Sequence, residues 1–494
     1  MSRRSEQELV RLEKLRRLRS AGFDFPNDVK GIVISKIVLD SPLEVPEKAL
    51  RFAIAGRLIS IREMGKAAFA HILDEGGRIQ IYVKADVVGE EAFKQFKDLD
   101  RGDIIQACGY VFVTKSGEKT LFTESFRLLT KALIPLPEKW HGLTDVEARY
   151  RNRYVDLIAN PAVRDVFRTR ARIIQVIRAF LEQRGFLEVE TPVLHYIAGG
   201  TTARPFKTYY QALDCDMYLR IALELPLKKL VVGGYERVYE IGRCFRNEGL
   251  SRKHSPEFTM LEFYQAYATF EDLMTLTEEL FAELARQICG TLQVRFGEHE
   301  LDFTPPWPRI TMVECVHKFG GVDRRFDLST LPGVQAAAAH YKIELTERND
   351  WGRSLEELWG QLAEAKMIQP VFLTQHPFSI SPLARKNAAN PQVTDRFELI
   401  VAGLEIANAF SELNDAVDQR ERMEEQARRK AAGDEEACEV DEDFLRALEH
   451  GLPPTAGEGI GIDRVVMLLT NQTSIRDVIL FPQLRPCGDG GDNA

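Results

Sequence analysis

Between residues 51 and 130 the apolar positions recur at the short period of β-strands. The segment RFAIAGRLISI alternates apolar and polar side chains, and FAHILD, RIQIYVK, DIIQACGYVFVT and TLFTESFRLLT follow it. Turn residues separate these runs, including Gly76-Gly77 and the KSGE segment. Five short strands in about 80 residues predict a small closed β-barrel, and the OB-fold is the commonest barrel of that size.

The rest of the chain mixes helical and strand patterns. Residues 133–158 begin with prolines and turn into a charged helix, which indicates a linker and a domain boundary. A long helix is predicted over residues 163–184, ended by Gly185, and the segment FLEVETPVL after it has the pattern of a strand. A second long helix is predicted over residues 270–288, where Thr269 and Asp272 form a capping-box-like start.

These patterns predict an α+β protein. A chain of 494 residues exceeds the usual size of a single core, so two or more domains are expected. The expected segments are residues 1–50 as a basic N-terminal helix and lead-in, 51–132 as the barrel, 133–158 as the linker, 159–487 as the larger domain and 488–494 as a disordered tail.

The composition is that of an ordinary globular protein, with 45% hydrophobic and 28% charged residues. No apolar run approaches the roughly 18 residues needed to span a bilayer, and the N-terminus lacks the apolar core of a secretory signal. The seven cysteines are scattered without a CxxC pair, which argues against a zinc site or a disulfide framework. We therefore expect a cytoplasmic protein with no membrane partner.

The net charge of −9 does not indicate a nucleic-acid binder, but the charge is unevenly distributed. Residues 3–19 hold seven Arg or Lys against three Glu. In the same segment Leu9, Leu12 and Leu15 recur at helical spacing. This pattern predicts a basic amphipathic helix, which either packs on the body of the protein or contacts nucleic acid.

Two residues of the predicted barrel are candidates for base recognition. Phe69 and Gln80 both occupy central strands, where OB-folds present aromatic rings for stacking and polar groups for base edges. From the residues alone, packing in the core is the slightly favoured interpretation of Phe69.

The stretch RCFRNEGLSRKHSPEF, residues 243–258, concentrates cations between two alternating strands, ERVYEIGRCF and EFTMLEFYQAY. A solvated surface hairpin is the common interpretation of such a charge run. Here the strand period places Phe258, Met260, Glu262 and Tyr264 on one face. A carboxylate on that apolar face is costly without a cationic partner, so the face indicates a ligand site.

The loop between these strands carries groups suited to a nucleotide. Arg246 stands at the exit of the first strand, and Glu248, His254 and Phe258 surround the same loop. A guanidinium, a carboxylate, an imidazole and an aromatic ring together suit a triphosphate and a flat base.

Acidic residues gather in DRFELIVAGLEIANAFSELND, residues 395–415. The segment predicts a hairpin that turns at Ala402-Gly403, with Glu398 on one strand and Glu405 on the other. Two facing carboxylates repel unless a cation lies between them, and hard oxygen ligands near phosphates favour Mg²⁺. The alternative is a pair of exposed acids. Strand parity places Asn408, Phe410 and Glu412 on one face of the second strand of this hairpin. That face would line a pocket.

A third element is GEGIGIDRVVMLLTN, residues 457–471. Its alternating glycines leave a strand backbone open to close approach, and Asp463 begins an apolar helix. Arg464, in the first turn, opposes the helix dipole, which indicates an anionic ligand. The spacing is not the dinucleotide fingerprint, and the GxxxxGK[ST] phosphate loop is absent.

Three of these segments together resemble a known family. FLEVETPVL, the FRNEG…HSPEF hairpin and GIGIDR…RDVILFP resemble motifs 1, 2 and 3 of the class II aminoacyl-tRNA synthetases, and the HIGH and KMSKS signatures of the other class are absent. A preceding OB-fold is similar to the subgroup for lysine, aspartate and asparagine, while GGTTARPF, YLRIALEL and FSELND resemble its lysine-specific members. The resemblance covers about residues 5–485.

The resemblance implies a fold and an activity. The fold would be an N-terminal OB-fold barrel followed by a class II antiparallel sheet flanked by helices, with a homodimer formed through motif 1. The activity would be ATP-dependent attachment of L-lysine to tRNA(Lys) through a lysyl-adenylate, with release of AMP and pyrophosphate. Mg²⁺ would be the cofactor, and the partners would be ATP, L-lysine and tRNA(Lys).

The resemblance also assigns residues by position. The implied catalytic residues are Arg246 and Arg464. The implied ATP-binding residues are Arg246, Glu248, His254, Phe258, Glu405, Gly461 and Arg464. The implied lysine-binding residues are Gly200, Glu224, Glu262, Tyr264, Asn408, Phe410 and Glu412. Mg²⁺ would be held by Glu398 and Glu405, and the anticodon by Phe69 and Gln80.

The chain departs from the family pattern at three positions. Lys253 and Ser255 stand where RHNPEF is usual, and lysine keeps the charge but loses bidentate phosphate binding. Pro226 replaces a residue that is commonly aromatic or polar, with no clear consequence.

Three alternative functions remain distinguishable. A paralogue that lysylates a protein such as elongation factor P would lack the barrel. An inactive synthetase-like regulator would have lost Arg246, Glu405 or Arg464, and all three are present. A synthetase for aspartate or asparagine would not keep Glu262 facing the amino-acid side chain.

Overall fold

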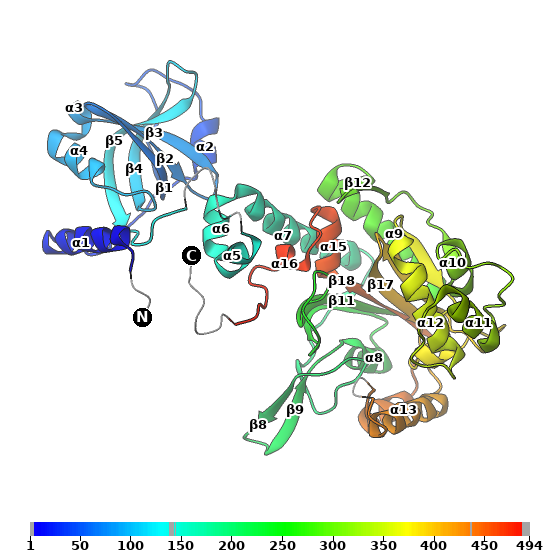
Figure 1. Ribbon diagram of the computed structural model, residues 1–494. Coiled ribbons are helices and arrows are strands. Elements are labelled where there is room, and N and C mark those ends of the chain that lie inside the picture. The colour runs from blue at the N-terminus through cyan, green and yellow to red at the C-terminus, as the bar shows by residue number, and fades with distance from the viewer. Residues whose placement is uncertain (1–3, 138–142, 144, 435–436, 487–494) are drawn as a thin grey trace. The chain divides into compact units, whose positions relative to one another are not determined.

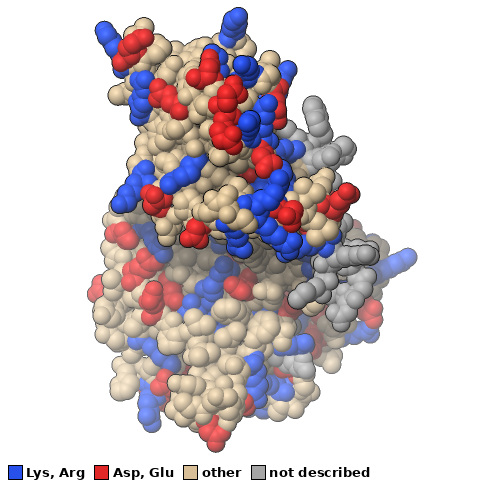
Figure 2. Space-filling model, turned by 90° about the vertical axis from the view of Figure 1, so that its left-hand side faces the viewer, with Lys and Arg blue, Asp and Glu red and all other residues tan. Residues whose placement is uncertain are grey.

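The computed structural model describes residues 4–137, 143, 145–434 and 437–486. The chain divides into two compact units, Met1–Thr144 and Asp145–Ala494, which are treated separately below. Among the described helices, none is both long and apolar enough to cross a membrane. On the face shown in Figure 2, basic and acidic side chains are interspersed.

The first unit is built on a closed five-stranded barrel with the strand order β1-β2-β3-β5-β4 (Figure 1). Its strands are β1 (Phe52–Met64), β2 (Ala67–Leu73), β3 (Arg78–Lys84), β4 (Ile104–Val113) and β5 (Lys119–Thr130). Its helices are α1 (Glu6–Ser20), α2 (Ser35–Asp40), α3 (Ala85–Val88) and α4 (Glu90–Lys97). The prediction of a small closed barrel is therefore confirmed.

The barrel closes because its first strand pairs on both sides. The N-terminal half of β1 pairs with β4 and its C-terminal half with β2, and the register shifts between Leu58 and Ser60. The alternation seen in the sequence places small and branched apolar side chains such as Ala70, Ile81 and Leu121 in the interior. Phe93 and Phe96 of α4 complete this core.

Helix α1 begins with a capping box between Ser5 and Glu8, as its sequence favours. Its predicted apolar stripe is only partly realised, because Leu15 is buried whereas Leu9 is 54% exposed. Arg11 is buried instead, and its guanidinium donates to the carbonyl oxygens of Ala132 and Ile134. The predicted basic helix is therefore present, but its buried side holds a hydrogen-bonded arginine as well as Leu15.

The second unit contains an eight-stranded sheet with the order β14-β15-β16-β17-β18-β11-β10-β6. All its neighbours are antiparallel except the edge pairs β14–β15 and β6–β10. Its strands are β6 (Leu187–Glu188), β10 (Arg237–Phe245), β11 (Glu257–Ala266), β14 (Arg309–Thr311), β15 (Val371–Thr374), β16 (Arg396–Val401), β17 (Leu404–Ser411) and β18 (Thr455–Gly461). The predicted α+β class with a largely antiparallel core is confirmed.

Two small sheets accompany it, formed by β7 (Leu194–His195), β8 (Lys207–Tyr210) and β9 (Cys215–Leu219), and by β12 (Gln293–Phe296) and β13 (His299–Asp302). The helical elements of this unit are α5 (Val146–Arg151), α6 (Arg153–Ala159), α7 (Pro161–Glu182), α8 (Glu224–Val232), α9 (Phe270–Leu284), α10 (Met312–Lys318), α11 (Leu331–Tyr341), α12 (Trp351–Leu362), α13 (Ala416–Ala431), α14 (Glu442–Glu449), α15 (Ile462–Leu469) and α16 (Ile475–Val478). Short π- and 3₁₀-turns cover Ala285–Cys289, Glu364–Lys366 and Phe378–Ile380.

One face of the large sheet is covered by α7, α9 and α15 (Figure 1). The main hydrophobic core lies there, between residues such as Ile177 of α7, Phe281 of α9 and Val466 of α15 and the buried side of β11, β16, β17 and β18. Because strand side chains alternate in direction, the other set of residues on these central strands points away from this core. That opposite face is where the polar residues selected from the sequence gather.

Both long helices predicted from the sequence are present. The helix expected over residues 163–184 is α7, and Gly185 after it has φ +78°, a conformation that suits glycine. The helix expected over 270–288 begins with the predicted capping box of Thr269 and Asp272, and its last turn is a π-turn.

Other expectations need correction. Of FLEVETPVL, strand β6 in the large sheet comprises only Leu187–Glu188, and Leu194 pairs in a small sheet. Between them, Thr191 donates from its backbone N–H and its hydroxyl to the carboxylate of Glu240. The stretch expected as linker, 133–158, becomes helical as predicted, in α5 and most of α6. Arg153 and Asp156 of α6 are fully buried, so this C-terminal part packs within the second unit. The expected tail, 488–494, lies outside the described residues.

Candidate active site

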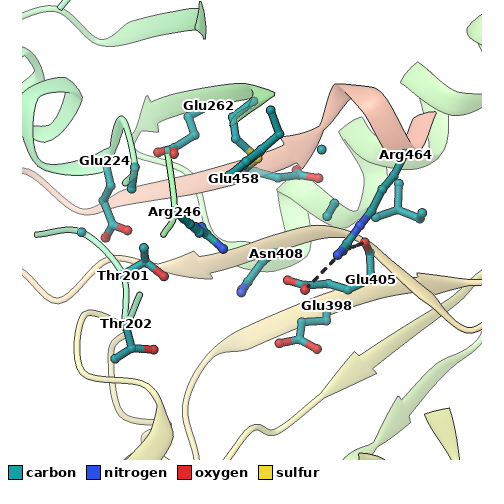
Figure 3. Close-up of a pocket in the computed structure, with 18 of the residues that line it drawn as sticks. Thr201, Thr202, Glu224, Arg246, Glu262, Glu398, Glu405, Asn408, Glu458 and Arg464 are labelled. Carbon is teal, nitrogen blue, oxygen red and sulfur yellow. Dashed lines mark hydrogen bonds and ion pairs between the residues drawn. The ribbon is translucent and has the colours of Figure 1, made fainter. Parts of the chain in front are cut away.

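The second unit has a cavity of about 360 Å³ on the face of the sheet opposite the main core. Its lining comes from the β10–β11 hairpin, the β16–β17 hairpin, β18, the start of α15 and the loop before α8. Figure 3 shows Glu224 and Glu262 toward one end and Glu398, Glu405 and Arg464 toward the other, with Arg246 and Asn408 between them. The volume is in the range of small-molecule sites.

Most of the residues selected from the sequence meet in this cavity. All seven expected ATP-binding residues and both expected Mg²⁺ ligands line it. Of the expected lysine-binding residues, Gly200, Glu224, Glu262, Tyr264, Asn408 and Phe410 line it as well. Glu412 does not line the cavity and is buried behind its wall.

The β10–β11 hairpin positions Arg246 immediately after β10. The backbone N–H of Arg246 donates to the carbonyl oxygen of Pro256 at 2.8 Å, which closes the base of the loop. Its guanidinium lies 5.0 Å from the centre of the Phe258 ring, a cation–π distance. The ring therefore holds the guanidinium at the cavity wall, where it can meet an anion.

The loop beyond Arg246 is ordered by Ser251. The Ser251 hydroxyl accepts from the backbone N–H groups of Lys253 and His254 and lies 3.0 Å from His254 Nδ1. Burial, followed by the charge of Arg464, lowers the pKa of His254, so its imidazole is neutral at pH 7. Lys253 Nζ donates at 3.0 Å to the carbonyl oxygen of Gly403, which ties this loop to the turn between β16 and β17.

Glu262 lies on β11 with Phe258, Met260 and Tyr264, all of which line the cavity as strand periodicity predicted. Its carboxylate accepts from the backbone N–H of Leu223 at 2.9 Å and from the Tyr264 hydroxyl at 3.2 Å. Burial, followed by the nearby carboxylate of Glu224, raises the pKa of Glu262 to about 7. A cationic ligand would favour its ionised form.

Helix α8 contributes Glu224 and a residue that sequence reasoning missed, Lys228. Lys228 Nζ lies 2.5 Å from Glu224 Oε1 and also pairs with Glu412, and its side chain is fully buried. The i,i+4 spacing of Glu224 and Lys228 was a signal for this pair. Pro226, one of the departures from the family pattern, stands in the first turn of α8, where its missing N–H has no intrahelical partner.

Gly200 and Gly457 leave the room that the acidic end of the cavity needs. A Cβ atom on Gly457 would lie 2.2 Å from the Tyr264 ring and 2.4 Å from Glu412 Oε1. Gly200 has φ +96°, and a Cβ there would lie 3.4 Å from Cβ of Glu224. Any side chain at Gly457 would displace the residues that surround it.

The β16–β17 hairpin turns at Ala402 and Gly403, both with positive φ, as predicted. Leu399 pairs with Ala407 and Ile400 with Glu405, so β17 carries one extra residue, a β-bulge. The bulge shifts the parity of β17, and Glu405 therefore lines the same cavity as Asn408 and Phe410.

Glu398 is the most perturbed acid at the second end of the cavity. Its Oε1 lies 2.5 Å from a guanidinium nitrogen of Arg396, which also donates to the Asn408 side chain. Burial raises the pKa of Glu398 to about 8; Arg396 opposes this rise, and neighbouring carboxylates, first Glu405 and then Glu356, reinforce it. Sequence reasoning did not identify Arg396.

The carboxyl groups of Glu398 and Glu405 fit a Mg²⁺ ion that is shared with phosphates. Within the described part of the chain, no group of three or more His, Cys, Asp or Glu side chains could hold a metal by itself. Mg²⁺ is commonly bound by one or two carboxylates together with substrate phosphates. Glu398 and Glu405 supply two such carboxyl groups, and a bound cation would favour the ionised form of Glu398, whose pKa is raised first by burial.

Arg464 stands in the first turn of α15, as predicted, and points into the cavity. Its guanidinium donates to the Glu405 backbone carbonyl and lies 3.6 Å from the Glu405 carboxylate. The preceding residue, Asp463, accepts from the Arg170 guanidinium of α7 and from the backbone N–H of Thr259 on β11. These bonds fix the start of α15 against β11, and thus Arg464 near Phe258.

Glu458 lies on β18, and its side chain is directed toward helix α9. Glu458 is among the residues that line the cavity, but its buried carboxyl group accepts from the Thr277 hydroxyl of α9. Burial raises its pKa to about 8, so the group is neutral at pH 7. It belongs to the packing between β18 and α9.

In the first unit, Phe69 and Gln80 lie on β2 and β3 on the outer face of the barrel. The interior positions beside Phe69 are Ala68 and Ala70, while Phe69 is half-buried with its ring 4.7 Å from that of Tyr82. The slightly favoured interpretation of Phe69 as core was therefore wrong. Gln80 accepts from the Thr120 hydroxyl and donates to Glu118.

Comparisons with known proteins match each of the two units to a protein family. Residues 145–485 match the family described as "tRNA synthetases class II (D, K and N)", and residues 52–129 match "OB-fold nucleic acid binding domain". The chain is 53% identical over 478 residues to a lysine–tRNA ligase of Moorella thermoacetica, covering 97% of each chain. It is 50% identical over 487 residues to that of Bacillus subtilis, again covering 97% of each.

A lysine–tRNA ligase of Salmonella arizonae is 51% identical over 483 residues, covering 97% of this chain and 96% of the relative. The matched ranges cover the second unit from residue 145 to 485 and the barrel from 52 to 129. The chain belongs to the lysine–tRNA ligase family of the class II aminoacyl-tRNA synthetases.

Proposed function

We propose that this protein attaches L-lysine to tRNA(Lys) in an ATP-dependent reaction that passes through a lysyl-adenylate. The observation that carries the proposal is a single cavity with carboxylates at one end and nucleotide-binding groups at the other. Glu224 and Glu262 suit the ammonium groups of lysine, whereas an aspartate pocket would need cations at that end. Membership of the lysine–tRNA ligase family supports the same substrate.

The lysine subsite would lie between α8, β11 and β17. Glu224, close to Gly200, would meet the α-ammonium group, and Glu262 with Tyr264 would meet the side-chain amine. Phe410 and Asn408 would enclose the aliphatic stem from β17. Glu412 would act from behind the wall, because it is buried and does not line the cavity.

The ATP subsite would lie between the β10–β11 loop and α15. Phe258 and Arg464 would hold the adenine ring between them, and Glu248 would accept from its amino group. Arg246 would bridge the lysine carboxylate and the α-phosphate. His254, neutral at pH 7, would donate or accept a hydrogen bond near the outer phosphates without adding a charge.

Glu398 and Glu405 would hold Mg²⁺. The ion, when bound, would neutralise charge on the phosphate oxygens. On the protein side, Arg396 keeps the Glu398 carboxylate and the Asn408 amide in one orientation. Lys253, held by the Gly403 carbonyl, fixes the distance between the nucleotide loop and this hairpin.

Two transfers would follow from this arrangement. A lysine carboxylate oxygen attacks the α-phosphorus, a new P–O bond forms, and the bond to the pyrophosphate oxygen breaks. A terminal ribose hydroxyl of the tRNA then attacks the lysyl carbonyl, and AMP leaves. No protein side chain needs to act as the nucleophile, so catalysis rests on positioning and on charge neutralisation by Arg246 and Arg464.

The barrel would bind the anticodon, with Phe69 stacking on a base and Gln80 reading an edge. The half-exposed ring of Phe69 on the outer face supports this assignment. A homodimer in the cytoplasm completes the proposal. Apolar side chains exposed around motif 1, among them Leu187 at 47% and Leu194 at 44%, support a subunit interface there.

The alternative functions fit less well. A protein-modifying paralogue would lack the barrel, which is present. An inactive regulator would not keep Arg246, Glu405 and Arg464 together in one cavity, as they are here.

Amino-acid-dependent ATP–pyrophosphate exchange tests the proposed function. We expect exchange with lysine and none above background with aspartate or asparagine, because the acidic end of the cavity repels the side-chain carboxylate of aspartate and finds no ammonium group on the side chain of asparagine. The assay uses the purified full-length protein with a panel of amino acids at equal concentration. Exchange that depends on aspartate alone would overturn the assignment.

Replacing Glu262 with Gln tests the lysine subsite. The substitution keeps the shape and one of the two hydrogen-bond acceptors of Glu262 but removes the charge that faces the substrate amine. We expect the lysine KM in the exchange assay to rise more than threefold, a change of about 0.7 kcal/mol. The ATP KM serves as the internal control. A smaller change in lysine KM would move Glu262 out of the subsite.

Replacing Phe69 with Ala separates the barrel from the cavity. We expect a higher KM for tRNA in aminoacylation, because base stacking on an aromatic ring contributes about 1–3 kcal/mol. Lysine-dependent exchange should stay at the level of the unsubstituted protein. Equal loss of both activities would mean that Phe69 supports the fold rather than the anticodon.

A further inference from the structure

Lys228 is a fully buried cation in the wall of the proposed lysine subsite. Its ammonium group lies 2.5 Å from Oε1 of Glu224 and pairs with the carboxylate of Glu412. The aromatic rings of Phe410 and Phe444 approach it at 5.4 and 5.8 Å. Two of the three acids expected to recognise lysine thus already hold an ammonium group of the protein itself.

Lys228 has no contact with solvent, so it does not serve as a surface charge. The Lys228 side chain has no exposed area, and burying an ammonium group is costly unless it is paired and enclosed. For Glu412, which is itself buried, Lys228 is the one cation within ion-pair distance among the described residues. The two aromatic rings add a favourable contact with the cation.

Lys228 also contributes one positive charge to the net charge of the subsite. When all three are ionised, Glu224, Glu262 and Glu412 supply three negative charges, and the ammonium group of Lys228 leaves two of them uncompensated. Free lysine brings two ammonium groups, and its carboxylate faces Arg246 in the proposed arrangement. The number of uncompensated negative charges therefore equals the number of ammonium groups in the substrate.

We propose that Lys228 is a positioning and specificity-determining residue, which holds Glu224 and Glu412 in place as carboxylates and matches the charge of the subsite to a diammonium substrate. The inference rests on the proposed lysine-activating function. It assigns Lys228 no contact with the substrate, because Lys228 does not line the cavity. Lys228 acts through the two acids that it pairs with.

The electrostatics of the wall support this role. Burial raises the pKa of Glu224 and of Glu412, and the charge of Lys228 opposes that rise in both. The two carboxylates in turn more than offset the burial of Lys228 and raise its pKa. Without Lys228, the two acids would take up protons at a higher pH and lose their attraction for an ammonium group.

Other ionisable groups also face this cluster. They come from several elements: Glu262 and Tyr264 of β11, Arg396 of β16, Arg246 after β10, and Cys438 before α14. Glu262 itself has a pKa raised to about 7. The unsubstituted protein should therefore show a rise of kcat/KM for lysine through about pH 7 as this acid ionises.

The test compares Lys228→Met with Lys229→Met. Lys229 is the next residue of α8, and its partner is the largely exposed Asp443, so the control loses the same charge outside the subsite. The lysine-dependent exchange rate is measured from pH 6 to 8.5, together with the ATP KM. For Lys228→Met we expect the midpoint of the kcat/KM profile to move up by one pH unit or more, and the lysine KM at pH 7 to rise on the order of tenfold. For Lys229→Met both should stay within about twofold of the unsubstituted protein.

A profile for a folded Lys228→Met protein with an unchanged midpoint and an unchanged lysine KM would overturn the inference. If that variant does not fold, the double variant Lys228→Met/Glu412→Gln removes the buried pair together and is measured in the same way. The same upward shift is expected there because Glu224 has still lost its cation, and an unchanged midpoint overturns the inference. Absence of lysine-dependent exchange in the unsubstituted protein would instead reject the proposed function, and the role of Lys228 with it.

Discussion

Repulsion among buried carboxylates is the constraint on which the second unit depends. Glu224, Glu262 and Glu412 come from three separate elements and lie in or behind one wall, where burial disfavours their charged forms. The protein tolerates them because each has a specific partner: Lys228 for two of them, and a backbone N–H with a tyrosine hydroxyl for Glu262. The negative charge that these partners leave uncompensated is the charge that the ammonium groups of lysine would neutralise in the proposed function.

The strand order of the large sheet brings the residues of the cavity together. Strands β11, β17 and β18 are neighbours, so their cavity-facing residues converge without any loop having to order. Gly457 leaves space beside Tyr264, and the bulge in β17 brings Glu405 onto the cavity side. The opposite face of the same strands packs on α7, α9 and α15, which keeps the strands rigid. Asp463 joins that packing to the nucleotide end of the cavity.

Much of the fold and of the candidate site could be predicted from the sequence, because the period of a strand and the residues of a turn depend only on neighbouring positions in the chain. The face shared by Phe258, Glu262 and Tyr264 and the turn at Ala402-Gly403 follow from a few neighbouring residues. Lys228 was missed because a Glu–Lys pair four residues apart is ordinary on exposed helices, and burial is a tertiary property. The outward position of Phe69 likewise depends on which alternating set faces the barrel interior. Arg396 gave no separate signal within its acidic segment.

We expect lysine to bind an acidic subsite in which one acid, Glu262, is partly protonated in the free protein. Calorimetric titration of lysine into the protein in two buffers with different ionisation heats measures this directly. Burial raises the pKa of Glu262 to about 7, and an ammonium group favours its ionised form. Lysine binding at pH 7 should therefore release protons, with a binding heat that differs between the buffers, and this difference should diminish at pH 8. Identical heats in both buffers at pH 7 would contradict the account.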